Sequence, residues 1–225
     1  MNEIAKRIAE IALDIKAIKL QPNDPFTWAS GLRMPLYNDN RLLLGSAAHR
    51  RAVTDGFEAL FRERYPTGGI DVIAGTSTAG IPWGVALADR VELPFVYVRE
   101  KPKTHGKKKR VEGVLPQGAR VLLVEDLIST GGSSVSALLG VREEGGTIDT
   151  CLSIFSYCFP EAEDQFRQAQ ATYRSLLRFP ELLEIAQERK AITPADVAVL
   201  DEWSRSPLTW GAAHGFPPVV KEQAA

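Results

Sequence analysis

The segment RVLLVEDLISTGGSS, residues 120–134, is the part of this 225-residue chain that most strongly predicts its fold. Its unbroken apolar run, Val121 to Val124, is typical of a strand buried on both faces. Two adjacent carboxylates, Glu125 and Asp126, follow where a parallel strand would leave the sheet. A short loop of glycine and hydroxyl residues then leads into a helix predicted over 134–144. This order predicts an α/β fold with a parallel sheet.

The loop at 129–133 is suited to hold a phosphate group. Gly131 and Gly132 let a ligand approach the backbone, and the N–H groups and dipole at the start of the next helix favour an anion. The alternative is a solvated turn followed by a flexible link. The segment is neither a Walker loop nor the Gly-x-Gly-x-x-Gly of dinucleotide folds. The acid pair beside the loop favours a site for a phosphate together with a sugar diol or a metal.

Composition indicates an ordinary globular protein. Hydrophobic residues make up 44% and charged residues 24%, and the net charge is −1. We therefore expect neither nucleic acid nor membrane as an obligatory partner. No run approaches the ~20 apolar residues that span a bilayer, and charges interrupt the N-terminal segment, unlike a signal peptide. Cys151 and Cys158 match no metal-ligand spacing and predict buried thiols in a reducing, cytoplasmic environment.

Hydrophobic periodicity predicts one domain over 1–225, with three parts. A helix at 3–19 and a β-hairpin at 26–41 form an N-terminal part over about 1–45. An α/β core over about 46–160 has strands at 70–74, 94–98, 121–124 and 147–155, and helices at 47–64, 83–90 and 134–144. A C-terminal extension over about 161–225 has an edge strand at 171–177 and helices at 161–169 and from 180 and 194. The βαβα succession predicts a parallel sheet with helices on both faces.

A second loop of small residues follows the strand at 70–74. It contains Thr76, Ser77, Thr78, Ala79 and Gly80. The carboxyl ends of parallel strands lie at one edge of an open α/β sheet, and ligands bind at that edge. We therefore expect this loop and the loop at 129–133 to approach the same ligand. A purely structural role is the alternative, because loops between strands and helices are commonly rich in Gly and Thr.

The segment 99–113 is strongly basic. Seven of the twelve residues from 99 to 110 are Lys or Arg, so we expect a mobile loop that cannot bury itself. A solvated run of charge is the plain alternative. A nucleic-acid patch is disfavoured because no aromatic residues are interleaved to stack on bases. The position of the segment, after a strand that ends at the same sheet edge, instead predicts a basic lid over two phosphate sites.

Four segments of the chain resemble motifs of the type I phosphoribosyltransferases, and in particular of the orotate phosphoribosyltransferase family. Residues 120–134 resemble the motif that binds phosphoribosyl pyrophosphate, and residues 78–82 resemble the family's Thr-Ala-Gly-Ile-Pro segment. The family's N-terminal hood is matched at Phe26, Thr27, Ser30, Gly31, Pro35, Tyr37, Asp39 and Arg41. Its catalytic loop is matched at Tyr97, Val98, Arg99, Lys101, Lys103, His105, Gly106, Glu112 and Gly113.

The resemblance implies a type I phosphoribosyltransferase fold with a hood subdomain. It implies transfer of the phosphoribosyl group from 5-phosphoribosyl 1-pyrophosphate to orotate. The products would be orotidine 5′-monophosphate and pyrophosphate, in the synthesis of pyrimidines and UMP. It further implies Mg2+ on the pyrophosphate, near Glu125 and Asp126 but with no direct protein ligands. A homodimer is implied in which the lid at 99–113 serves the neighbouring subunit.

The resemblance also assigns individual residues. Asp126, Lys103 and His105 are the implied catalytic residues, with Lys103 and His105 stabilising the departing pyrophosphate. Glu125 and Asp126 would hold the 2′ and 3′ hydroxyls of the ribose. Contacts to phosphoribosyl pyrophosphate are expected from Arg99, Lys101, Lys103, His105, Glu125, Asp126, Ser129, Thr130, Gly131, Gly132, Ser133, Thr76 and Ser77. Contacts to orotate are expected from Tyr37, Arg41, Thr78, Ala79, Gly80 and Ser129.

The chain departs from the family pattern mainly near the base. Ser156 and Tyr157 stand where some members have an Asp-Arg pair whose arginine binds orotate, and we predict Arg41 as its replacement. Smaller departures occur at Ala29, Met34, Ala79 and Glu100. Two alternatives stay open at this point. One is a phosphoribosyltransferase for another base, and the other is a nucleotide-sensing, RNA-binding regulator of the same fold.

Overall fold

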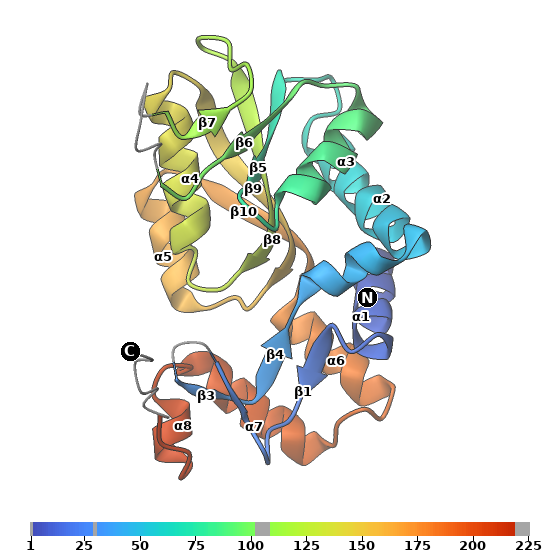
Figure 1. Cartoon of the computed structure of the whole chain (residues 1–225). Helices are drawn as coiled ribbons and strands as arrows, with labels where there is room; N and C mark the ends of the chain where they lie inside the picture. Colours follow the sequence, from blue (N-terminus) through green and yellow to red (C-terminus); the bar gives the residue numbers. More distant parts are fainter. Residues whose placement is uncertain (1, 29–30, 102–108, 219–225) are drawn as a thin grey trace, which may run out of the picture.

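A computed structural model describes residues 2–28, 31–101 and 109–218 and has a six-stranded sheet at its centre (Figure 1). The strand order is β10-β9-β8-β5-β6-β7. These strands are β5 (Val72–Thr76), β6 (Phe95–Val98), β7 (Val111–Glu112), β8 (Arg120–Ile128), β9 (Thr147–Ser156) and β10 (Thr172–Arg178). Neighbouring strands pair in parallel except β7, which pairs with β6 in the antiparallel sense. The predicted α/β class and parallel sheet are confirmed.

Helices cover both faces of this sheet (Figure 1). The α-helices of the described residues are α1 (Glu3–Asp14), α2 (Ala47–Arg64), α3 (Ile81–Val91), α4 (Gly132–Glu143), α5 (Pro160–Gln168), α6 (Phe179–Glu188), α7 (Pro194–Arg205) and α8 (Trp210–Ala213). The last two lie away from the six-stranded sheet, beside the N-terminal strands (Figure 1). One apolar cluster includes residues of α1, α2, α3, α6 and α7, and a second includes residues of α4 and α5. Strand β8 supplies both, with Leu122 and Val124 in the first and Val121 and Leu123 in the second.

Several predicted elements are confirmed with their end signals. Helix α2 covers 47–64 as expected, and the Ser46 hydroxyl accepts a hydrogen bond from the backbone N–H of Ala48 at 3.2 Å. Thr193 caps α7 in a reciprocal pair with Asp196, ahead of a proline at the first helical position. Strand β10 lies at the edge of the sheet, as predicted for 171–177. No helix in the described ranges is long and apolar enough to cross a membrane.

The N-terminal part differs from the prediction. Helix α1 ends at Asp14 rather than at residue 19, because Lys16 lies in the left-handed region with φ +59° and the chain turns there. Ile18 still faces the core, but in strand β1 (Ile18–Leu20), which pairs with β4 (Leu36–Asn38). The hairpin predicted at 26–41 is present but shorter, because β2 (Phe26–Thr27) pairs with β3 (Arg33–Met34) in the antiparallel sense. The rest of that segment forms β4 and the start of a 3-10 helix, η1 (Asn40–Gly45).

The acid pair lies inside β8 rather than after it. The strand continues to Ile128, with Glu125 opposite Ser153 and Leu127 opposite Phe155 on β9. Charge was expected to mark the strand end, but the side chain of Glu125 is itself buried. Helix α4 also begins at Gly132, two residues before the prediction. The expectation of two buried thiols holds for Cys151 only, because Cys158 is half-buried; both are free of disulfides.

The C-terminal extension packs against the N-terminal part, which we call the hood (β1 to β4 and η1). Trp203 of α7 is fully buried among the rings of Tyr157, Phe159 and Phe179. Its indole N–H donates to the sulfur of Met34 in β3 at 3.2 Å. Trp210 is buried as well, so both tryptophans pack the C-terminal segment onto the body, as the sequence predicted.

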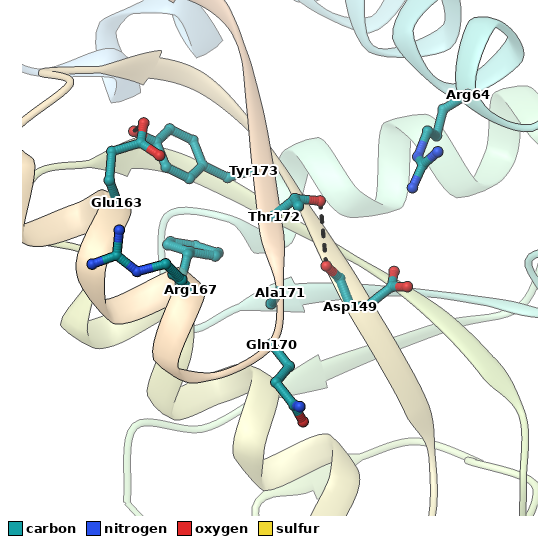
Figure 2. A pocket seen from close by; sticks show the side chains of 9 residues that line it. Arg64, Asp149, Glu163, Arg167, Gln170, Ala171, Thr172 and Tyr173 are labelled. Atoms are coloured by element: carbon teal, nitrogen blue, oxygen red, sulfur yellow. Dashed lines mark hydrogen bonds between the residues drawn. The ribbon is translucent and has the colours of Figure 1, made fainter.

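A cavity of about 510 Å3 lies at the amino end of β9 and β10, away from the strand ends that carry the acid pair (Figure 2). Arg64 and Arg167 contribute positive charge to it, and Asp149 and Glu163 contribute negative charge. Most of these charges already have partners. The Tyr173 hydroxyl donates to Glu163 at 2.8 Å, and Arg167 is paired with Asp164. The cavity therefore lacks the chemistry that the sequence predicts for the functional site.

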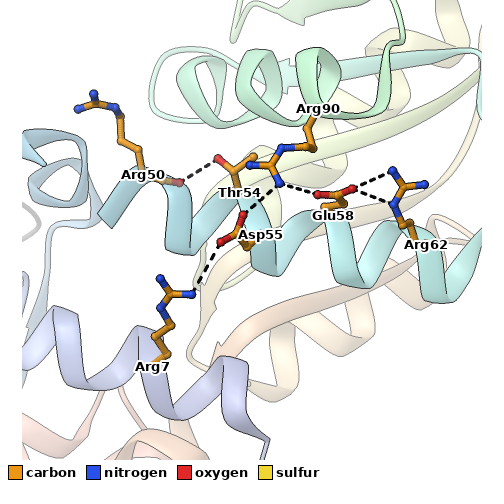
Figure 3. Close-up of polar contacts among 7 residues, drawn as sticks. All are labelled: Arg7, Arg50, Thr54, Asp55, Glu58, Arg62 and Arg90. Carbon is orange, nitrogen blue, oxygen red and sulfur yellow. Dashed lines mark hydrogen bonds and ion pairs between the residues drawn. The ribbon is translucent and has the colours of Figure 1, made fainter. Parts of the chain in front are cut away.

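A chain of ion pairs joins three helices on one face of the sheet (Figure 3). Arg90 of α3 contacts Asp55 at 3.1 Å and Glu58 at 2.7 Å, both on α2. Asp55 also pairs with Arg7 of α1 at 3.7 Å. These side chains are partly exposed, so each pair contributes little alone, but the network fixes α2 and α3 relative to each other. Helix α3 begins at the second predicted loop, so the network also supports the site.

Candidate active site

The carboxyl ends of β5, β8 and β9 lie side by side and bring the predicted site residues together. β8 lies between β5 and β9 in the sheet. The loop after β5 contains Thr76 to Gly80, and the loop after β8 contains Ser129 to Ser133. The hood adds Tyr37 and Arg41 through a hydrogen bond from the Asn40 side-chain amide to the backbone carbonyl of Asp126, at 2.7 Å. The sequence prediction of one shared edge is confirmed for these described residues.

Glu125 points to the α4 face of the sheet and is 5% exposed. One carboxyl oxygen accepts the backbone N–H of Asp126 at 3.0 Å, and the other accepts the Ser134 hydroxyl at 3.4 Å. Burial, followed by the nearby charge of Asp126, raises the pKa of Glu125 to about 8. The side chain is therefore mainly protonated at neutral pH, and it links β8 to the first turn of α4.

Asp126 points to the opposite face, toward the hood, because successive residues of a strand alternate. It is only partly buried. Burial raises its pKa, and the Arg41 guanidinium acts in the opposite direction. Arg41 itself is 67% exposed and forms a two-pronged pair with Asp39, at 2.6 and 3.0 Å. Asp126 is therefore the accessible acid of the pair, with a cation close by.

The loop after β8 has the backbone geometry of an anion site. Gly131 has φ +86°, a conformation that glycine adopts without strain, and a Cβ there would lie 3.3 Å from Ala162. Helix α4 follows directly, and no side chain caps its N-terminus. Its first N–H groups thus stay available to a ligand, and the helix dipole favours negative charge. These features suit the 5′-phosphate that the sequence predicts for 129–133.

The loop after β5 packs tightly onto β8 through Gly80. A Cβ on Gly80 would lie 2.4 Å from the Thr76 hydroxyl and 2.5 Å from the carbonyl oxygen of Val124. The Thr76 hydroxyl in turn donates to that carbonyl at 3.4 Å. Gly80 therefore sets how closely the loop approaches the strand that carries the acid pair. The peptide bond between Ser77 and Thr78 is cis.

We expect Gly80→Ala to lower the free energy of unfolding by about 2–3 kcal/mol, because the clash includes backbone that cannot rotate away. Urea unfolding followed by circular dichroism measures this change. Gly45→Ala is the matched control, since a Cβ on Gly45 meets nothing within 4 Å. Equal stability of the two variants would contradict the tight approach of the loop.

The hood presents an aromatic surface beside Asp126. Tyr37 is 38% exposed, with the Lys19 ammonium 5.8 Å from its ring centroid and the Phe26 ring at the same centroid distance. Trp28 packs against Tyr157 at 5.8 Å, and its indole N–H donates to the carbonyl of Leu36 at 3.0 Å. Tyr157, which stands where an orotate-binding arginine was considered, is 2% exposed and belongs to the core.

The basic segment is described at its two ends only. Arg99 and Lys101 follow β6, and the Arg99 guanidinium lies 3.6 Å from Glu112 of β7. Lys103 and His105, two of the predicted catalytic residues, lie outside the described residues. A cavity of about 350 Å3 is lined by Ser77, Thr78, Tyr97, Arg99, Glu100 and Lys101. The loop after β5 and the start of the basic segment therefore share one depression.

Sequence reasoning missed three residues that organise this edge. Asn40 fixes the hood to Asp126, and Ser134 contacts Glu125. Arg110 joins the returning arm of the basic segment to α4. Asn40 lies within the matched hood motif and Ser134 at the end of the first motif, so the motifs pointed to both positions. Arg110 follows a run of lysines, and nothing in the sequence distinguished it from them.

The fold and the site define a class. A parallel sheet carries an acid next to a phosphate loop, and a second small-residue loop and a basic segment lie at the same edge. The family profile described as "Phosphoribosyl transferase domain" matches residues 47–165. The chain therefore belongs to the phosphoribosyltransferase family.

Relatives with more than 40% identity are orotate phosphoribosyltransferases. An orotate phosphoribosyltransferase of Lactiplantibacillus plantarum is 44% identical over 211 residues, covering 94% of this chain and 99% of the relative. One from Enterococcus faecalis strain OG1RF is 42% identical, covering 94% and 100%. The crystal structure of orotate phosphoribosyltransferase from Aeropyrum pernix superposes with a TM-score of 0.70 at 26% identity, covering 83% of this chain and 99% of that one.

Proposed function

We propose that this protein transfers the phosphoribosyl group of 5-phosphoribosyl 1-pyrophosphate to orotate. The bond between the anomeric carbon and pyrophosphate breaks, and a bond to the orotate nitrogen forms, giving orotidine 5′-monophosphate for pyrimidine and UMP synthesis. The observation that carries the proposal is the hydrogen bond from Asn40 to Asp126, at 2.7 Å. This bond joins the hood, to which we assign base binding, to the strand position that carries Asp126.

The roles of the residues follow from the charge that develops during the reaction. The ribose becomes cationic as pyrophosphate leaves, so an accessible carboxylate beside the ribose lowers the activation barrier. We propose that Asp126 is this carboxylate. Glu125 and Asp126 bind the ribose hydroxyls, and the neutral form of Glu125 also holds Ser134 and the phosphate loop. Ser129, Thr130, Gly131, Gly132 and Ser133 bind the 5′-phosphate through backbone N–H groups and hydroxyls.

The pyrophosphate end of the substrate is assigned to the loop after β5 and the basic segment. Thr76 and Ser77 offer hydroxyl and backbone donors, and Arg99 and Lys101 offer positive charge. Lys103 and His105 complete this set, with His105 as the proton donor to the leaving group. We propose that the orotate ring lies between Thr78, Ala79, Gly80 and Ser129 on one side and Tyr37 and Arg41 on the other.

We propose that Mg2+ binds the pyrophosphate of the substrate near Glu125 and Asp126, without direct protein ligands. Mg2+ keeps several waters and is commonly held by substrate phosphates, so such a position fits the ion. Bound there, the ion would neutralise charge on the pyrophosphate and help it to leave. The described residues contain no cluster of three or more potential metal-ligating His, Cys, Asp or Glu side chains. We further propose a cytoplasmic homodimer, with no nucleic-acid or membrane partner, and a single domain over 1–225.

The test is pyrophosphate release with Mg2+, phosphoribosyl pyrophosphate and a panel of bases. We expect turnover with orotate and at most about 1% of that rate with uracil, adenine or hypoxanthine, because a site that pairs with a substrate's polar groups rejects analogues lacking them. A preference for a purine would contradict the assignment of orotate as the acceptor but would still support phosphoribosyl transfer. Salt-dependent RNA binding without turnover would replace the enzyme by a regulator.

A further inference from the structure

Arg110 makes an unusual set of contacts near the end of the basic segment. Its guanidinium donates to the Arg99 carbonyl at 3.0 Å, to the Ser136 carbonyl at 2.9 Å and to the Ser136 hydroxyl at 3.0 Å. No carboxylate shares this guanidinium among the described ion pairs. Three of its five N–H donors are thus directed at fixed neutral oxygens on two different segments, the end of β6 and helix α4.

Glu144 holds the backbone of the same residue. One oxygen of its carboxylate accepts the backbone N–H groups of Arg110 and Val111, at 2.5 and 2.9 Å. The backbone N–H of Arg99 donates to the Arg110 carbonyl at 2.8 Å. Residue 110 is therefore fixed by its main chain to the end of α4 and by its side chain to the first half of that helix.

The sequence of α4 is adapted to this arginine. Gly140 lies in the interior of the helix, where glycine destabilises by about 1 kcal/mol relative to alanine. A Cβ on Gly140 would lie 3.2–3.3 Å from three atoms of the Arg110 guanidinium group. Glycine thus leaves the space in which the flat guanidinium lies against the helix. This gives a physical reason for a residue that helix propensity alone disfavours.

The contacts join three parts of the site. Helix α4 starts at the phosphate loop, Arg99 is a proposed pyrophosphate ligand, and the loop after β5 lies between them. A cavity of about 150 Å3 is lined by residues of all three parts, namely Thr76, Ser77, Val98, Arg99, Glu100, Arg110, Ser133, Ser136 and Ala137. Arg110 therefore connects the end of β6 to the helix that begins at the loop after β8.

We propose that Arg110 is a positioning residue for the pyrophosphate end of the substrate. It holds the main chain of Arg99 at a fixed distance from α4, so that the Arg99 side chain and the phosphate loop bind the two ends of one molecule. This role rests on the proposed function, because it needs Arg99 to bind pyrophosphate. It assigns Arg110 no contact with substrate.

Three variants change this contact in different ways. Arg110→Ala removes it, and Arg110→Lys keeps the charge but cannot reach three oxygens on two segments. Gly140→Ala leaves residue 110 unchanged and displaces its guanidinium, while alanine itself favours the helix. Arg205→Ala is the matched control, because it removes an exposed arginine of α7, paired with Asp201, that belongs to no part of the candidate site.

The readouts are KM for each substrate, kcat, and the affinity for pyrophosphate alone by calorimetry. We expect KM for phosphoribosyl pyrophosphate and Kd for pyrophosphate to rise about tenfold or more in Arg110→Ala and about threefold in Gly140→Ala. KM for orotate should change less than about twofold, because the misplacement is confined to one end of the substrate. Arg110→Lys should be intermediate, and Arg205→Ala should resemble the wild type.

Unchanged pyrophosphate affinity in both Arg110→Lys and Gly140→Ala would overturn the proposal, as would equal rises in both KM values. The two mild variants decide the matter even where Arg110→Ala fails to fold. Failure of the proposed function would look different. In that case the wild type itself would form no product from orotate, whatever residue 110 is.

Discussion

Replacing Asp126 by asparagine is expected to lower kcat by about a thousandfold, while KM for phosphoribosyl pyrophosphate stays within about threefold. The carboxylate matters most when the ribose carries positive charge, which occurs in the transition state. Asparagine keeps the size and one acceptor oxygen, so ground-state hydrogen bonds to the sugar largely remain. The loss should therefore appear in kcat rather than in KM.

The structure offers a close control for this variant. Asp71 binds Arg120 at 2.8 Å, at the amino end of the same strand β8, and the bond to Arg120 lowers the pKa of Asp71 to about 2. Asp71→Asn removes the same charge far from the site, so kcat should stay within about twofold of the wild type. A kcat for Asp126→Asn that matches the kcat for Asp71→Asn would contradict the assignment of Asp126 to catalysis.

Replacing Glu125 by glutamine is expected to make the folded protein less sensitive to alkaline pH. The folded-state pKa of Glu125, about 8, lies well above the ordinary glutamate value of 4.5. Between these values the folded state binds a proton that the unfolded chain has released. The stabilisation is complete below the unfolded pKa and is lost as pH rises through the folded pKa, at no more than about 1.4 kcal/mol per pH unit.

Glutamine does not ionise, so it removes this loss. We expect the stability of Glu125→Gln relative to the wild type to rise by about 2–4 kcal/mol from pH 5 to pH 9, measured by urea unfolding at each pH. Glu184→Gln, on the exposed face of α6, makes the same substitution and should follow the wild-type curve. Parallel curves for Glu125→Gln and the wild type would show that Glu125 is already ionised in the folded protein.

Sequence reasoning predicted the core of the fold because its signals were local and strong. Apolar runs marked β5, β6, β8 and β9, and capping residues marked α2 and α7. It failed where a strand depends on a distant partner. β1 exists because it pairs with β4, and the two-residue strand β7 exists because it pairs with β6. Such short strands have too few residues for a periodic pattern.

The position of the candidate residues at one edge of the sheet was predictable from the sequence, and the geometry of their side chains was less so. Gly-rich loops after buried strands correctly indicated one shared edge. The side chains of Glu125 and Asp126 point in opposite directions because both residues belong to the strand, where side chains alternate. Their charges had favoured a position after the end of the strand instead. The sequence also predicted that Arg41 is the cation that binds orotate. Its bond to Asp39 satisfies much of its donor capacity, and its role in binding orotate stays a prediction.

The packing of the hood against the last helices has a consequence for the order of folding. The indole of Trp203 contacts Met34, and the backbone around Gly211 approaches that of Arg33 so closely that a Cβ would lie 2.9 Å from its carbonyl oxygen. During synthesis the N-terminal hood emerges first but meets these partners last. The last strand of the central sheet ends at Arg178, so the sheet can assemble on the ribosome before α7 and α8 are available to cover the hood. The hood would then be the last part of the molecule to pack, although it is among the first to be synthesised.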